Sequence, residues 1–271
     1  MKKLLTTALL FCLCSSAYAA GTLKVCADPD YLPYSNKAGE GFENAVAESV
    51  AKALNMKLEY TWGDMRAHGG FPEFLSRNLD SGKCDVVMSM PYGNGEELTT
   101  DPYYVSSYVF VFKSNGGLDI KDMNSPDLRK AKIGFESDTP VESGLQVRGL
   151  VTAATSFDVG AKSGESPKTM LDAVQSGAVN VMITWQPAIG AFLHDYPDLT
   201  TVALPNTRAT GSPEMYSFPM SMAVRKDDTA LRDRLNAVIK SQQQTLTGVL
   251  HKHGVQMFGE GNAPDTSTAG L

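Results

Sequence analysis

An α/β fold of two lobes, each a mainly parallel sheet flanked by helices, is what the sequence predicts. Three observations lead to this prediction. Short β-forming segments alternate with helical segments through most of the 271 residues, as they do in parallel α/β sheets. A second series of such segments begins near residue 132 with its own helix-start signals. Two further β-forming segments, residues 108–113 and 221–226, lie where the chain would cross between lobes, so we expect a hinge of two antiparallel strands.

The first series of segments follows the order strand, helix, strand, helix, strand. Residues 23–27 form the first expected strand, and the apolar residues from Phe42 to Leu54 then recur at helical spacing. A strand at 57–62, a helix around 74–79 and a strand at 85–90 complete the series. This alternation predicts a parallel sheet.

The second series has clear helix boundaries. Residues 132–135 read as a strand, and Thr139 and Ser166 are each followed by Pro, a pairing typical of an N-cap with Pro at the first helical position. Gly177 would close the second of these helices, and residues 179–184 form another buried strand. These strands need not belong to the first sheet.

The order of the segments predicts how the chain divides. Residues 20–110 and 221–260 would form lobe 1, and residues 111–220 lobe 2. A long amphipathic helix with apolar residues from Leu231 to Leu246 would complete lobe 1 and end near Gly254. Residues 261–271 end a stretch rich in Gly, Pro, Ser and Thr, and we expect them to form a mobile tail.

Residues 1–19 have the features of a secretory signal peptide. Two lysines precede an apolar run, residues 4–13, and residues 17–19 form a small-residue cleavage site. A transmembrane anchor is the alternative, but this run is too short to cross a hydrocarbon core of about 30 Å. We therefore expect export to the periplasm.

Removal of that segment leaves two cysteines, Cys26 and Cys84. Cysteines usually pair in oxidising compartments. If the strands that hold them are parallel neighbours, their Cα atoms could lie near the distance of about 5.5 Å that a disulfide prefers. We expect a disulfide, and two free buried thiols are the alternative. Neither the cysteine spacing nor the nearby histidines indicate a metal site.

The charge of the chain limits its partners. The formal net charge is −6, and no run of Lys or Arg stands out. Proteins that bind nucleic acid or anionic membrane surfaces carry such basic runs. After residue 13 no apolar stretch approaches a membrane span in length. We expect neither a nucleic-acid partner nor a membrane partner.

The loops at the carboxyl ends of the predicted strands should line one cleft, because ligands collect there in open α/β sheets. Many of these loop residues are apolar or aromatic, and filling of the space between lobes is the alternative role for them. The expected cleft residues are Asp28, Tyr31, Tyr34, Trp62, Met65, Met90, Pro91, Tyr92, Glu136, Ser137, Asp138, Thr139, Thr184 and Trp185.

Several short motifs carry a family resemblance. The order Asp-Pro-Asp-Tyr-Leu-Pro-Tyr at 28–34, Gly-Phe-Glu at 41–43 and Asp-Pro-Tyr-Tyr at 101–104 resembles type-3 periplasmic solute-binding proteins over nearly the whole mature chain. Residues 41–44, 84–88, 102–111 and 185–192 are more specific. They are similar to a subfamily of binding-protein relatives associated with quinoprotein methanol dehydrogenase in methylotrophic bacteria.

This resemblance implies a two-lobed periplasmic binding protein of type II architecture. It further implies a non-catalytic accessory protein of PQQ-dependent methanol dehydrogenase, whose cleft contacts the large subunit of that enzyme in methanol oxidation, during maturation or activation. The pyrroloquinoline quinone would belong to the partner, and we expect no cofactor in this chain. The alternative is a substrate-binding protein of an ABC transporter for a small organic solute.

One departure from the family bears on the ligand. Amino-acid binders of this family usually carry an Arg shortly before the Pro-Tyr-Tyr element, where its guanidinium holds the ligand carboxylate, but residues 94–101 contain no Arg. Glu136, Asp138 and Glu142 surround a helix start that would otherwise hold an anion. We therefore expect an apolar or aromatic ligand, or a segment of the partner, rather than a free amino acid.

An enzyme is the remaining alternative. Asp28, Glu136, Asp138 and His68 could supply acid–base groups. Acid–base catalysis requires such groups within hydrogen-bond reach of a reacting atom, and no spacing here indicates that arrangement. We expect no catalytic activity.

Overall fold

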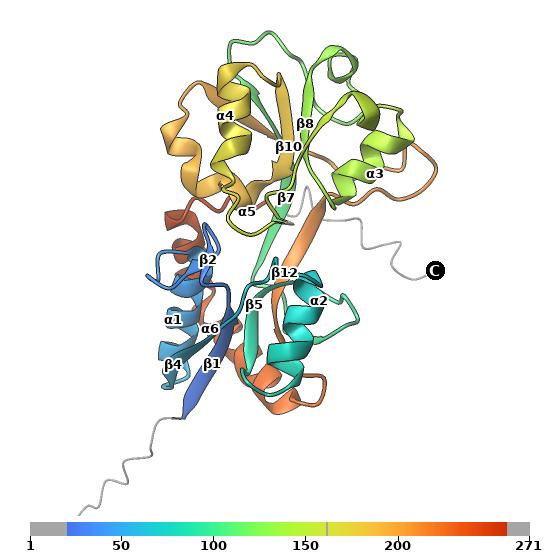
Figure 1. Ribbon diagram of the computed structural model, residues 1–271. Coiled ribbons are helices and arrows are strands. Elements are labelled where there is room, and N and C mark those ends of the chain that lie inside the picture. The colour runs from blue at the N-terminus through green and yellow to red at the C-terminus, as the bar shows by residue number, and fades with distance from the viewer. Residues whose placement is uncertain (1–20, 161, 259–271) are drawn as a thin grey trace, which may run out of the picture.

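The computed structural model of the chain describes residues 21–160 and 162–258. The expected signal peptide and the expected tail lie outside the described residues. Two lobes stand one above the other, and the long strands β7 (Tyr104–Lys113) and β12 (Ser217–Val224) pass between them (Figure 1). The predicted α/β class with two lobes is confirmed.

Lobe 1, the lower part of Figure 1, is built on a sheet with strand order β4-β1-β5-β12. The first three strands are parallel, and β12 runs antiparallel to β5. The elements of lobe 1 besides β12 are β1 (Thr22–Ala27), β2 (Asp30–Tyr31), β3 (Ser35–Asn36), α1 (Phe42–Ala53), β4 (Lys57–Trp62), α2 (Gly70–Leu75), a π-helical turn (Ser76–Asp80), β5 (Val86–Pro91), β6 (Leu98–Thr99) and α6 (Thr229–Lys252).

The helical spacing of apolar residues determines how α1 packs. Phe42, Val46 and Val50 are fully buried in the core of lobe 1, because residues four apart share one face of a helix. The helix expected around 74–79 instead begins at Gly70 and ends in the π-helical turn.

Lobe 2 is built on a sheet with strand order β7-β10-β8-β9, in which β8, β9 and β10 are parallel. Its further elements are β8 (Ile133–Glu136), α3 (Pro140–Val147), β9 (Thr155–Phe157), α4 (Lys168–Ser176), β10 (Val181–Trp185), α5 (Gln186–Ile189), β11 (Leu199–Ala203) and three 3-10 turns (Leu128–Lys130, Val151–Ala153, Gly190–Asp195). Pro140 opens α3 as predicted. By contrast, α4 begins after Pro167, and Gly177 ends it in the left-handed conformation with φ 78°.

Strand β7 pairs with elements of both lobes. Its first part pairs with β12, with Tyr104 opposite Met220 and Ser107 opposite Ser217. From Tyr108 onward it pairs with β10 and β11 of lobe 2. The hinge therefore consists of two antiparallel strands as predicted. The pairing lies earlier along both strands than the expected segments 108–113 and 221–226, because the chain from Tyr108 onward already pairs inside lobe 2.

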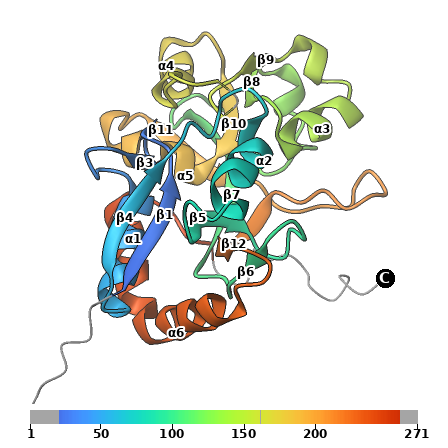
Figure 2. The ribbon, with the colours of Figure 1, turned by 60° about the horizontal axis from the view of Figure 1, so that its bottom comes forward.

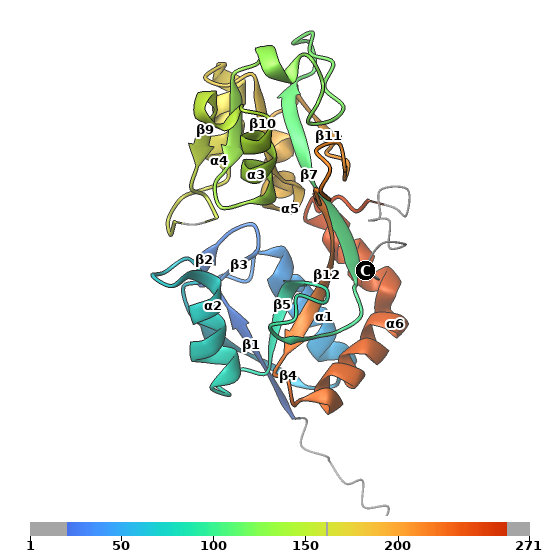
Figure 3. The same ribbon diagram turned by 90° about the vertical axis from the view of Figure 1, so that its right-hand side faces the viewer.

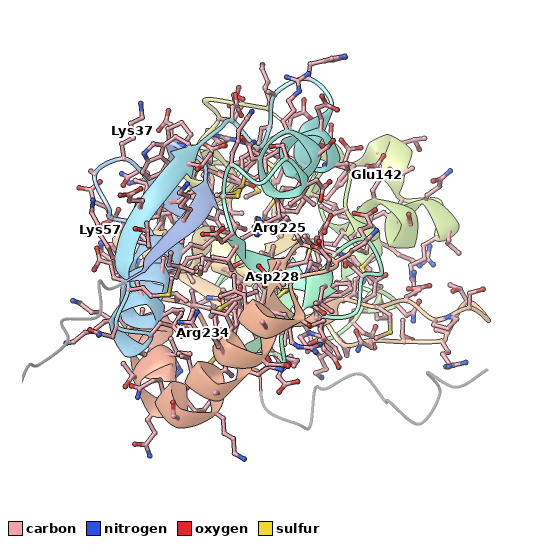
Figure 4. The ribbon with its side chains drawn as sticks, turned by 90° about the horizontal axis from the view of Figure 1, so that it is seen from below. Lys37, Lys57, Glu142, Arg225, Asp228 and Arg234 are labelled. Carbon is pink, nitrogen blue, oxygen red and sulfur yellow. A yellow bond between two sulfur atoms is a disulfide. The ribbon has the colours of Figure 1, made fainter. Side chains whose placement is uncertain are left out.

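Helix α6 is attached to lobe 1 at its first turn and runs along the lower face of that lobe (Figure 2). The Asp228 carboxylate accepts the Leu231 N–H at 3.1 Å, which caps the helix. The guanidinium of Arg225 lies 3.2 Å from Asp228 and 3.6 Å from Asp85, so the same cation ties the start of α6 to the start of β5 (Figure 4). Neither α6 nor any other helix within 21–160 and 162–258 is long and apolar enough to cross a membrane.

The predicted disulfide is confirmed. Cys26 on β1 and Cys84 before β5 are bonded, with Cα atoms 5.5 Å apart. Both residues are fully buried, and the strands are parallel neighbours with Cys26 opposite Val87. The bond thus ties together two central strands of lobe 1.

Replacing Cys26 and Cys84 together by Ala is expected to lower the free energy of unfolding by about 2–4 kcal/mol, since the bond joins residues 58 apart and constrains the unfolded chain. Urea unfolding followed by circular dichroism measures this. In the presence of reductant, the wild-type protein should unfold at the same urea concentration as the variant. Reductant should not change the unfolding midpoint of the variant. Equal midpoints for the oxidised wild type and the variant would contradict the prediction.

Candidate functional site

A cavity of about 370 Å³ lies between the two lobes. This volume is in the range of small-molecule sites. Its walls come from the β2–β3 turn and β5 of lobe 1, from β8, α3 and β10 of lobe 2, and from both hinge strands. The lining residues are Tyr34, Pro91, Tyr108, Glu136, Pro140, Trp185, Phe218 and Met220.

Four of the eight residues that line the cavity are aromatic. Tyr108 on β7, Trp185 at the end of β10 and Phe218 on β12 pack together, with ring centroids 5.3 to 6.5 Å apart. On the lobe 1 side, the ring of Tyr34 lies 5.3 Å from that of Phe42, the residue that begins α1. These packed rings give the cavity rigid apolar walls.

Glu136 places a carboxyl group on this aromatic wall. It is the last residue of β8 and only 7% exposed. Burial raises the pKa of this carboxyl, while the hydroxyl of Thr184, which donates to Oε2 at 3.0 Å, opposes the shift. A Cβ atom at Gly160 would lie 2.8 Å from Oε1, so glycine at that position leaves room for the carboxyl.

A second buried acid lies on the lobe 1 side. Glu43 in the first turn of α1 is 6% exposed. Burial raises its pKa to about 7, the carboxylate of Asp28 adds to that shift, and the Ser89 hydroxyl opposes it. Glu43 and Glu136 both raise the pKa of the Tyr34 hydroxyl, after burial itself and Tyr31. Both carboxyl groups therefore lie near the Tyr34 side of the cavity.

Arg66 connects the lobes on the side away from the hinge. It follows β4 in lobe 1, is 8% exposed, and its guanidinium lies 4.2 Å over the Tyr31 ring. Its Nη2 donates to the Asp30 carbonyl oxygen at 2.7 Å. Its Nη1 donates to three carbonyl oxygens of lobe 2 at 3.3 to 3.4 Å, those of Val159, Lys162 and Glu165.

A neighbouring side chain pair adds to this connection. The Ser163 hydroxyl of lobe 2 donates to the Asp64 carboxylate of lobe 1 at 2.5 Å. Figure 3 shows the arrangement from the side: β7 and β12 join the lobes at one edge, and at the other edge the lobe 2 loop before α4 descends toward β2 and α2. We call the contacts of Arg66 and Ser163 the front contact. The cavity lies between this contact and the hinge.

Four of the expected cleft residues line the cavity: Tyr34, Pro91, Glu136 and Trp185. Several of the others hold the surrounding backbone. The Asp28 carboxylate accepts the N–H groups of Asp30 and Met65 at 2.9 and 2.8 Å.

The polar residues of lobe 2 have similar roles. Ser137 donates to the Asp158 carboxylate at 2.7 Å, and Thr139 donates to the Glu136 carbonyl oxygen at 2.7 Å. Thr184 orients the Glu136 carboxyl. Asp138 adopts the left-handed conformation with φ 57°.

The remaining expected residues lie around the cavity rather than in its lining. Met65 and Met90 are buried beneath α2. Trp62 stacks on Tyr60 with ring centroids 4.6 Å apart. Tyr92, next to Pro91, is 51% exposed and stands on the rim.

Sequence reasoning missed two groups of residues. Tyr108, Phe218 and Met220 lie on the hinge strands rather than in loops at strand ends, and the hinge pairing is earlier along β12 than expected. Arg66 lies within an expected cleft loop, but its partners in lobe 2 are 93 to 99 residues away in the chain. The hydropathy pattern of β12 offered a signal for the first group, whereas no local pattern marks the second.

The donor set of the described residues does not indicate a metal centre. Within residues 21–160 and 162–258, no three His, Cys, Asp or Glu side chains come together in an arrangement that could hold a metal ion.

The two lobes, the hinge and the cavity between them define a binding protein. The profile of bacterial extracellular solute-binding proteins, family 3, matches residues 23–254, and the chain belongs to this family.

Individual relatives cover most of the chain. Protein MoxJ of Methylorubrum extorquens is 30% identical over 255 residues, which are 88% of this chain and 82% of MoxJ. The crystal structure of MxaJ from Methlophaga aminisulfidivorans superposes with a TM-score of 0.79 at 29% identity, covering 87% of this chain and 100% of that one. ABC transporter arginine-binding protein 1 of Escherichia coli is 24% identical over 87% of this chain and 91% of its own.

Replacing Arg66 by Gln is expected to let the lobes move apart, because three hydrogen bonds across the front contact are lost. Small-angle X-ray scattering should show a larger radius of gyration, and the free energy of unfolding should fall by about 1–3 kcal/mol. Arg77→Gln is the matched control, since Arg77 pairs with Glu73 inside lobe 1. An unchanged radius for Arg66→Gln, equal to that of the control, would refute this role.

Replacing Glu43 by Gln is expected to change how stability depends on pH. The pKa of about 7 in the folded protein exceeds the ordinary 4.5, so the folded state holds this proton more tightly. The stability contribution of the protonated carboxyl is full at low pH and is lost as pH rises through about 7.

Glu43→Gln should therefore match the wild type near about pH 4 and exceed its free energy of unfolding by up to about 3 kcal/mol near about pH 8. Chemical unfolding across this range measures the difference. Glu48→Gln, at an exposed position of the same helix, should show no such trend. A difference that stays constant with pH would argue against a buried, protonated Glu43.

Proposed function

We propose that this protein is a periplasmic, non-catalytic accessory protein of a PQQ-dependent methanol dehydrogenase. Its interlobe cleft and rim contact the large subunit of that enzyme, or a segment of it, during maturation or activation in methanol oxidation. The similarity to MoxJ and MxaJ over most of the chain supports this proposal, together with the subfamily motifs at 41–44, 84–88 and 185–192.

The aromatic cavity carries the structural argument. Its lining holds a carboxyl group and no Lys or Arg, so a free amino acid would bring its carboxylate close to Glu136 without a guanidinium to hold it. A carboxylate that loses water contacts and gains no cationic partner is destabilised. A receptor for free amino acids fits this site poorly, whereas a partner segment with apolar groups fits it well.

The rim offers a surface for such a contact. Tyr92 is 51% exposed and directly follows Pro91, which lines the cavity. Tyrosine is among the residues that contribute most to protein interfaces. A partner that covers the mouth of the cavity would bury this ring.

The arrangement of the acid–base groups supports a non-catalytic role. Both Asp28 oxygens accept backbone N–H groups, and His68 is exposed outside the cavity lining. The four groups considered from the sequence do not converge on one reacting position. Glu136 alone lines the cavity.

A receptor for a small organic solute is the second candidate, favoured by the similarity to an arginine-binding protein. Native mass spectrometry of the protein isolated from the periplasm separates the two. A bound dehydrogenase supports the accessory role, and a bound metabolite supports the receptor.

Replacing Tyr92 by Ala is expected to weaken capture of purified methanol dehydrogenase by about tenfold, because an exposed rim tyrosine would lose its contact area. Biolayer interferometry with the immobilised variant measures this. The control is Val147→Ser, since Val147 is 62% exposed at the far end of α3. Equal binding by the wild type and Tyr92→Ala would remove this rim from the interface.

A further inference from the structure

Most of the residues that line the cavity are uncharged. Eight residues line it, and Glu136 is the charged one among them. The nearby Glu43 is a second buried acid. Arg66 directs its guanidinium at backbone carbonyl oxygens of both lobes. It does not line the cavity. The lining therefore offers an anion no Lys or Arg as a partner.

Two hydrogen bonds hold the Glu136 carboxyl in place. Thr184 donates to Oε2 at 3.0 Å, and the backbone of Trp185 adds a second hydrogen bond that lowers the pKa of the carboxyl against the effect of burial. Oε1 lies close to Gly160, where a Cβ atom would be 2.8 Å away, so glycine is needed there for the carboxyl to keep this position. A buried carboxyl with these partners is oriented, but its charge is not neutralised by any lining residue.

Aromatic faces surround this carboxyl. Tyr34, Tyr108, Trp185 and Phe218 line the same cavity, and three of them pack within 5.3 to 6.5 Å of one another. Organic cations bind to such walls, because the faces of aromatic rings carry negative potential. A carboxylate beside the rings adds direct charge pairing in a site of low dielectric constant.

We propose that the cavity binds an organic ammonium group carried on an apolar stem. The ammonium pairs with Glu136, and the stem packs against the rings of Tyr108, Trp185 and Phe218. A free alkyl or aryl amine and a lysine side chain of the partner protein share this chemistry. The second source rests on the proposed accessory function, whereas the first does not.

Isothermal titration calorimetry with three matched probes tests the proposal: 2-phenylethylammonium, its neutral analogue 2-phenylethanol, and the anion 3-phenylpropionate. The wild-type protein should bind the ammonium at least about tenfold more tightly than the alcohol, and the anion more weakly than either. Hexylammonium, which lacks the ring, should also bind. An alcohol that binds as tightly as the ammonium, or the absence of any ammonium binding at millimolar concentration, overturns the proposal.

The variant Glu136→Gln tests whether Glu136 is the group that pairs with the ammonium. This variant should lose at least about tenfold in affinity for the ammonium and keep the affinity of the wild type for the alcohol, which also shows that the cavity is intact. Glu142→Gln is the control, because Glu142 lies on α3 outside the lining (Figure 4). Unchanged ammonium binding by Glu136→Gln refutes the proposed pairing.

A competition experiment distinguishes the two sources of the ammonium. Saturating 2-phenylethylammonium should displace methanol dehydrogenase if a lysine of the partner enters the cavity, and should leave the complex intact if the ligand is a free amine. Both outcomes presuppose ammonium binding. If the proposed accessory function is wrong, no complex with methanol dehydrogenase forms, although the calorimetry still shows that 2-phenylethylammonium binds.

Discussion

One guanidinium, that of Arg66, joins the two lobes at the edge opposite the hinge, and the cavity lies between this contact and the hinge strands. Arg66 has a planar fork of donors, which here reaches carbonyl oxygens of both lobes while its face rests on Tyr31. Hydrogen bonds from a charged group are stronger than those between neutral groups.

The cavity departs from what an amino-acid receptor of this fold requires. Such a receptor must supply opposite charges for the two ends of its ligand, and a guanidinium commonly meets the carboxylate. Here Glu136 supplies the charged group of the lining, and four of the eight lining residues are aromatic. The chain thus has the lobes and hinge of a solute-binding protein around a cavity whose lining holds aromatic rings, a carboxyl group and no Lys or Arg.

The sequence predicts an element of the fold well where the pattern lies in neighbouring residues, and poorly where the contact joins residues far apart in the chain. Strands β1 and β4 and helix α1 lie where hydropathy periodicity placed them, because burial of one face dictates that pattern. Strand β12 begins earlier than expected, at Ser217, and contains Pro219, a residue that normally argues against a strand. The partners of Arg66 became visible only in the folded chain, since the folded topology brings them together.

Strand β7 pairs with strands of both lobes, and this limits how the lobes can move relative to one another. Its pairing changes from β12 to the lobe 2 strands between Ser107 and Tyr108, so any rotation of one lobe against the other must twist the backbone at this junction. The ring of Tyr108 is attached there and faces the cavity. The angle between the lobes and the position of the Tyr108 ring in the cavity are therefore coupled through one short stretch of backbone.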